Sequence, residues 1–168
     1  MRILVTVASR HGATQEIGDE VARVLAEAGH EVDVVPPDDV EHVERYDGVV
    51  LGSAVYVGRL AASLRALVER CGAQLADLPV WLFWSGPLGA PAIPPTEPDD
   101  VGVIARRVGA RSVQAFDGRL QGTGLTLSER ALVSLIDAPR GDFRDFDAVR
   151  EWAAVVADDL ARLVAASD

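Results

Sequence analysis

The stretch "VTVASRHGATQEIG" (residues 5–18) decides how the rest of the chain is interpreted. An apolar run ends at Ala8, six small or polar residues follow, and a helical pattern then begins. A continuous apolar run is typical of a strand that is buried on both faces of a parallel sheet. The stretch therefore predicts a strand, a tight loop and a helix in direct succession. The loop is either a turn and nothing more, or a pocket for a negatively charged ligand.

The same alternation continues along the chain. Apolar or alternating segments predict five strands, at residues 2–8, 30–35, 47–54, 79–85 and 111–116. Helical periodicity predicts helices at residues 16–28, 59–72, 99–110, 128–136 and 147–166. Strands that alternate with helices indicate βαβ units and a parallel sheet with right-handed crossovers. We expect a single α/β domain over residues 1–168, with a ligand beyond the carboxyl ends of the strands.

Composition excludes several classes of function. The formal net charge is −10, and the chain contains arginine but no lysine, so we expect no nucleic-acid partner and no electrostatic docking on anionic lipid. Cys71 is the only cysteine and falls on an apolar helix face, which predicts a core residue and excludes an intrachain disulfide. No apolar run reaches the roughly 18 residues of a membrane span, so we expect a cytoplasmic protein. The acidic pairs Asp38-Asp39, Asp99-Asp100 and Asp158-Asp159 resemble solvated helix caps and helix faces, and we expect no metal site.

The first loop has the features of a phosphate site. A helix N-terminus presents backbone N–H groups and the positive end of the helix dipole. Gly12 allows a close approach of the backbone, and Ser9 and Thr14 supply hydroxyl groups. Thr14 is also a candidate N-cap, whereas Arg10 and His11 either add charge or face water. A capped turn without a ligand stays open as the alternative.

The chain lacks the residues that three other phosphate-binding motifs require. A P-loop requires a lysine, and the chain has none. A dinucleotide fold requires three glycines after the first strand, and only Gly12 is present. A phospho-receiver domain requires acidic residues where this chain has Ala8, Ser9, Ser53 and Ala54. The loop therefore suits a phosphate monoester that is already attached to a larger molecule.

Two further loops follow predicted strands. They read "GSAVYVGRL" (residues 52–60) and "WSGPLGAP" (residues 84–91), and both are rich in glycine and small residues. Each has one aromatic residue at its rim, Tyr56 or Trp84, so a planar ring can lie between them with its polar edge on backbone groups. Plain packing is the alternative for both side chains.

These motifs resemble those of the flavodoxin-like FMN-binding proteins. The similar segments are "SRHGAT" (residues 9–14), "YDGVVLGSAVYVG" (residues 46–58) and "GDFRDFDAVREWA" (residues 141–153). Within that family, the chain resembles the branch of menaquinone-dependent protoporphyrinogen dehydrogenases. The resemblance implies a flavodoxin-like, doubly wound three-layer sandwich with a five-stranded parallel sheet in the order 2-1-3-4-5.

The resemblance also implies FMN as the cofactor and assigns three loops to it. The phosphate loop comprises Ser9, Arg10, His11, Gly12, Ala13 and Thr14. The two ring loops comprise Ser53, Ala54, Val55, Tyr56, Val57 and Gly58, and Trp84, Ser85, Gly86, Pro87, Leu88 and Gly89. The second ring loop is longer and richer in proline than the family pattern.

The implied function is that of an FMN-dependent redox protein. No residue stands out as a catalytic acid or base, and flavin electron transfer requires none. The chain is either an oxidoreductase that acts on a small substrate or quinone, or an electron carrier that docks on a redox partner protein. The segment from Asp117 to Asp145 is then a lid or partner surface, or a simple crossover. A flavin-free interaction module of the same fold is the alternative from another class.

Overall fold

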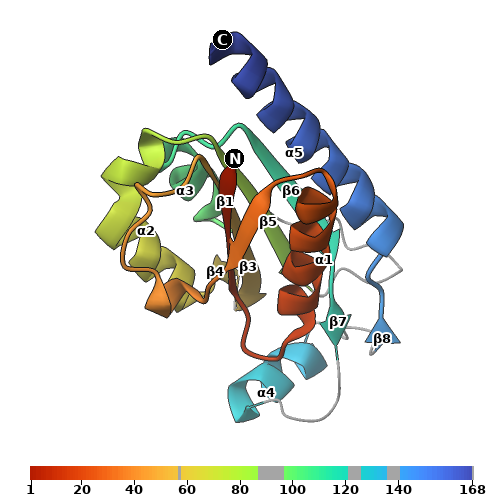
Figure 1. The fold of residues 1–168 in the computed structure, drawn as a ribbon. Helices are drawn as coiled ribbons and strands as arrows, with labels where there is room; N and C mark the ends of the chain where they lie inside the picture. The colour runs from red at the N-terminus through yellow and green to blue at the C-terminus, as the bar shows by residue number, and fades with distance from the viewer. Residues whose placement is uncertain (57, 87–96, 121–125, 136–140, 168) are drawn as a thin grey trace.

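The computed structural model describes residues 1–56, 58–86, 97–120, 126–135 and 141–167 (Figure 1). Val57, Pro87, Leu88 and Gly89 of the predicted ring loops lie outside these residues. The elements in chain order are β1 (Arg2–Ala8), α1 (Ala13–Glu27), β2 (Glu31–Val34), η1 (Pro37–Asp39), β3 (Gly48–Tyr56), β4 (Arg59–Leu60), α2 (Ala62–Ala76), β5 (Val80–Gly86), α3 (Val101–Arg107), β6 (Ser112–Asp117), β7 (Arg119–Leu120), α4 (Leu127–Leu135), β8 (Gly141–Asp142) and α5 (Phe146–Ser167).

The central sheet has the predicted topology. Its parallel strands lie in the order β2-β1-β3-β5-β6, which is 2-1-3-4-5 when the five strands are counted along the chain. The short strand β4 is an addition that the sequence analysis missed, and it pairs antiparallel with the end of β3. The order reverses between β1 and β3, and in sheets of this class ligands bind at the carboxyl ends of the strands at such a point.

Helices cover both faces of the sheet, as expected for a three-layer sandwich (Figure 1). On one face α1 and α5 pack on alternate sheet residues, with Phe83, Phe116 and Trp152 in mutual edge-to-face contact at 5.8–5.9 Å between ring centroids. On the other face α2 and α3 cover residues such as Leu4 and Leu82. The period of two along each strand thus divides the apolar residues between two cores.

Two helices differ from the predictions: α2 was predicted at residues 59–72 and spans Ala62–Ala76, and α3 was predicted at residues 99–110, capped by Asp99 or Asp100, and spans Val101–Arg107. Gly72 was expected to end α2, yet it is buried and the helix continues to Ala76. A Cβ at Gly72 would lie 2.9 Å from Nε of Arg107, so the glycine admits the Arg107 side chain from α3. Asp100 occupies the N-cap of α3 without a side-chain capping bond. Its carboxylate instead accepts a hydrogen bond from the N–H of Leu60 at 3.1 Å, because the fold brings the two segments together.

The other three predicted helices are present as α1, α4 and α5, although α1 starts three residues earlier than predicted, at Ala13. Cys71 is buried, and α5 directs its predicted apolar residues Val149, Trp152, Ala153, Val156 and Leu160 inward, with Leu163 partly buried. Among the described residues, no helix is both long and apolar enough to cross a membrane.

Candidate functional site

The predicted loops lie at one edge of the sheet because they follow the carboxyl ends of parallel, neighbouring strands. Ala8 pairs with Ser53, and Ser53 pairs with Trp84 in the parallel register. Ser85 in turn pairs with Phe116 on β6. The loops after β1, β3 and β5 therefore start side by side, at the edge where this class of sheet binds its ligands.

The loop after β1 turns sharply into α1. Gly12 occupies the N-cap with φ of +81°, a left-handed conformation that favours glycine, and a Cβ there would meet nothing within 4 Å. The Oγ of Ser9 accepts a hydrogen bond from the Gly12 N–H at 3.1 Å. The first N–H groups of α1 have no acceptor inside the helix, and they share the positive end of its dipole. The turn thus presents hydrogen-bond donors over an open approach.

Thr14 has a different role from the predicted N-cap. It lies inside the first turn of α1 and is 2% exposed. Its Oγ1 is 2.9 Å from the Oγ of Ser85, which is also buried. The hydroxyl pair joins the start of α1 to the end of β5, so Thr14 helps to position the loop after β1 through a buried contact. The N-cap prediction for Thr14 is wrong because the turn at Gly12 starts the helix two residues earlier.

Tyr56 lies at the rim, as predicted, and contacts the first loop. Its hydroxyl accepts a hydrogen bond from the backbone N–H of Arg10 at 2.7 Å. The Arg10 guanidinium carbon lies 4.7 Å from the centroid of the Tyr56 ring, within cation–π range. The ring of His11 approaches the same tyrosine edge-on, with centroids 6.3 Å apart. Tyr56 at the end of β3 and the loop after β1 therefore form one unit.

The rim position predicted for Trp84 is wrong. Trp84 is 4% exposed and packs in the core beneath α2 and α3. Its side chain shares a face of β5 with Leu82, because alternate residues of a strand point the same way. Core packing, the open alternative, is what the structure shows for this residue.

Hydrogen bonds of a buried serine stabilise the turn between β3 and α2. Ser53 has no exposed surface, and its Oγ donates to the carbonyl of Ala54 at 2.8 Å and accepts from the N–H of Ala61 at 2.9 Å. Gly58 adopts a φ of +71° at the tip of the β3–β4 hairpin. Ser53 therefore shapes this loop, and its assignment as a cofactor contact stays a prediction, as does that of Ala54 and Val55.

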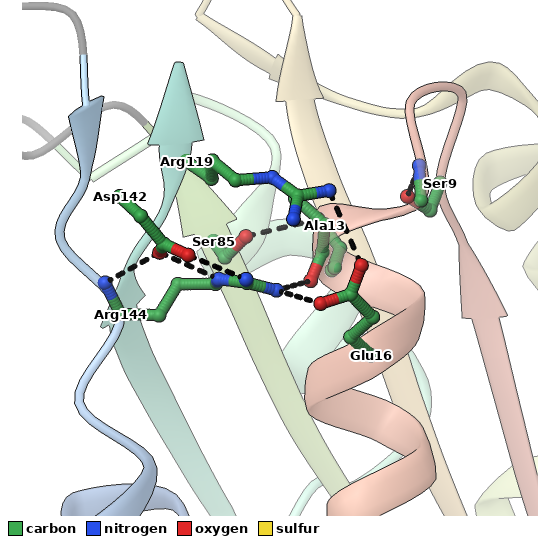
Figure 2. Close-up of polar contacts among 9 residues, drawn as sticks. Ser9, Ala13, Glu16, Ser85, Arg119, Asp142 and Arg144 are labelled. Atoms are coloured by element: carbon green, nitrogen blue, oxygen red, sulfur yellow. Dashed lines mark hydrogen bonds and ion pairs between the residues drawn. The ribbon is translucent and has the colours of Figure 1, made fainter. Parts of the chain in front are cut away.

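A buried arginine beside α1 was missed by the sequence analysis (Figure 2). The side chain of Arg144 is 4% exposed, and its Nε and Nη2 donate to the two carboxylate oxygens of Asp142 at 2.8 and 2.7 Å. Its Nη1 donates to the carbonyl oxygen of Ala13 at 3.1 Å and to Oε2 of Glu16 at 2.6 Å. Arg119 donates to the other Glu16 oxygen at 3.2 Å. These four charged residues are called the Arg144 cluster below.

The Arg144 cluster keeps its carboxylates charged. Hydrogen bonds from Arg144 lower the pKa of Asp142 to about 2 and also lower the pKa of Glu16. The only sequence signal was an acidic and a basic residue two positions apart, Asp142 and Arg144, before the last helix. Their partners on α1 are more than a hundred positions away, so no local pattern identifies them.

The segment from Asp117 to Asp145 connects the sheet to α5 and also contacts α1. Strands β7 and β8 pair antiparallel, with Arg119 opposite Asp142, and so bring the Arg144 cluster together. Figure 1 shows α4 at the end of the molecule where the strand carboxyl ends lie. Burial, with a smaller contribution from Asp145, raises the pKa of Asp117 at the end of β6. Described residues of the segment thus contact α1, and its roles as a lid, a partner surface or a simple crossover stay predictions.

Comparisons with known proteins agree with this geometry. The model of the flavodoxin domain family matches residues 4–147. The protoporphyrinogen IX dehydrogenase (quinone) of Escherichia coli K12 is 30% identical over 81 residues, which cover 47% of this chain and 45% of that protein. The match thus spans less than half the length of that relative.

Solved flavodoxins are similar in fold. A flavodoxin from the domain Archaea superposes with a TM-score of 0.63 at 12% identity, covering 96% of this chain and 99% of that one. Oxidised flavodoxin 1 from Bacillus cereus superposes with a TM-score of 0.59 at 15% identity, covering 92% and 95% of the two chains. At these identities the likeness establishes the fold alone.

Proposed function

This chain belongs to the flavodoxin domain family, and on that premise we propose that it is a redox protein with FMN as its cofactor. The strongest support is the turn at Gly12. This turn places the N–H groups of α1 at the sheet edge where the order reverses, next to open space at Gly12. A phosphate monoester suits these donors, and the carboxyl ends of β3 and β5 lie next to them.

Different residues contact the phosphate and the ring of FMN. The backbone N–H groups of α1 and the Ser9 hydroxyl bind the phosphate, and Arg10, an exposed cation of the same loop, lies close to them in sequence. Tyr56 flanks the flavin ring. The backbone at Gly86, in the second ring loop, contacts the polar edge of the flavin ring. FMN, when bound, supplies the one- and two-electron chemistry. The protein supplies binding, orientation and the electrostatic field.

For the reaction we infer an oxidoreductase that acts on a small substrate or a quinone. The partial match to a protoporphyrinogen IX dehydrogenase supports this role. The role of electron carrier is supported by a separate observation, the net charge of −10, which would steer a basic redox partner. Rapid reoxidation of the reduced protein by a water-soluble quinone would favour the first role. Salt-sensitive electron transfer to a basic redox protein, with no reoxidation by quinone, would favour the second.

The cofactor is tested with a matched pair of glycine variants. Gly12 and Gly29 lie at opposite ends of α1, both have positive φ (+81° and +91°), and a Cβ at either meets nothing within 4 Å. Alanine should therefore cost each about the same stability, roughly 1 kcal/mol. Only Gly12→Ala should reduce the FMN absorption that survives desalting. Wild type that retains no flavin, or equal loss in both variants, would contradict the proposal.

A further inference from the structure

The Arg144 cluster lies beside the donors that the proposed function assigns to the phosphate. Glu16 places a carboxylate in the first turn of α1, where it opposes the binding of a second anion. Arg144 and Arg119 both donate to this carboxylate, at 2.6 and 3.2 Å. The Arg144 side chain is 4% exposed and that of Glu16 is 47% exposed, so the guanidinium is shielded from water while the carboxylate is partly screened.

Arg144 also acts on one peptide group of the helix start. Its Nη1 donates to the carbonyl oxygen of Ala13 at 3.1 Å (Figure 2). That carbonyl and the N–H of Thr14 belong to the same peptide group. In a helix the N–H points toward the N-terminus, and a charged donor on the carbonyl polarises the whole group. The Thr14 N–H is thereby strengthened on the side from which an anion approaches.

We propose that Arg144 is a positioning residue that makes the start of α1 selective for a phosphorylated ligand. It neutralises Glu16 and polarises the Ala13–Thr14 peptide, while Asp142 holds its guanidinium in place through two hydrogen bonds. This inference rests on the proposed function. Its consequence is that Arg144 contributes to the affinity for FMN and not to the affinity for riboflavin, which lacks the phosphate.

The experiment compares the dissociation constants of FMN and riboflavin for each variant of the flavin-free protein. Arg144→Gln should weaken FMN binding about tenfold and change riboflavin binding less than about twofold. Arg144→Lys keeps the cation and should retain more of the FMN affinity. Arg162→Gln is the control, because it removes the same charge from an exposed pair with Asp159 on α5.

Glu16→Gln separates electrostatics from a merely structural role. Both Glu16→Gln and Arg144→Gln break the same ion pair, so a structural clamp would weaken FMN binding in both. We expect opposite signs: Glu16→Gln should tighten FMN binding about two- to fivefold and leave riboflavin binding unchanged. If Arg144→Gln fails to fold, Asp142→Asn, which releases the guanidinium, should lower the preference for FMN over riboflavin.

The outcomes distinguish the two proposals. Wild type that binds neither flavin would overturn the proposed function and this inference together. Wild type that prefers FMN, with the same preference in the Arg144→Gln and Asp142→Asn variants, would overturn this inference alone. Weakening of FMN binding in both Arg144→Gln and Glu16→Gln would also overturn it.

Discussion

A side chain at Gly118 should destabilise the protein, because Gly118 lies against the backbone at the end of a neighbouring strand. An ideal Cβ at Gly118 would lie 2.6 Å from the carbonyl oxygen of Gly86 and 3.0 Å from its carbonyl carbon. Gly86 is the last residue of β5 and belongs to the second loop assigned to the ring. The change Gly118→Ala should therefore disturb both the sheet and the candidate site.

The size of the effect follows from the contact. Cβ atoms are essentially never seen closer than 3.0 Å to such an atom, so the two strand ends must separate by at least about 0.4 Å. Forcing a methyl group into packed structure costs about 1–3 kcal/mol, and the lower entropy of the unfolded alanine chain offsets about 0.4–1 kcal/mol of that. We expect a net loss of about 1–2 kcal/mol in the free energy of unfolding. For a chain of this length this lowers Tm by about 2–8 °C.

Thermal unfolding followed by circular dichroism measures this effect, with Gly86→Ala as the matched control. A Cβ at Gly86 would lie 3.7 Å from Trp84 and Val55, which is ordinary contact, so its Tm should change by less than about 2 °C. A Gly118→Ala protein that melts at the wild-type temperature, or equal losses in both variants, would refute the reasoning.

Three other predictions concern buried polar groups and acid stability. Hydrogen bonds from Arg23, and to a smaller extent from Arg150, lower the pKa of Glu20 from 4.5 to about 2. The ionised Glu20 carboxylate therefore stabilises the fold fully above pH 4.5, and this stabilisation is lost as the pH falls toward 2. Glu20→Gln should flatten the fall in Tm between about pH 6 and about pH 3. Thr14→Val or Ser85→Ala alone leaves a buried hydroxyl unpaired at a cost of about 1–3 kcal/mol, and urea unfolding of the double variant should show less than the sum of the two. Asp100→Ala should cost a similar amount, about 1–3 kcal/mol in the same assay, because the buried Leu60 N–H loses its acceptor; an unchanged midpoint would contradict this.

Much of the fold was predicted because its signals are local. The apolar run at residues 2–8 predicted the bounds of β1, and the loop before Thr14 predicted the turn into α1. The period of the last helix identified its buried face, including Val149 and Leu160. These features depend on side chains only a few positions apart, so the sequence alone carries them. The sheet order came from the resemblance to a family, and the structure confirms it.

The parts that failed depend on distant partners. Trp84 could lie at the rim or in the core, and only the packing of α2 and α3 over β5 decided for the core. The local sequence predicted Thr14 as an N-cap. In the structure its hydroxyl instead pairs with that of Ser85, which lies 71 positions away in the sequence.

The sequence by itself determined the five parallel strands and the five helices, and its assignment of the first loop to a phosphate stays a prediction. Only the tertiary structure decided that Arg144 meets Ala13, across 131 positions, because long-range pairing depends on how all the elements pack.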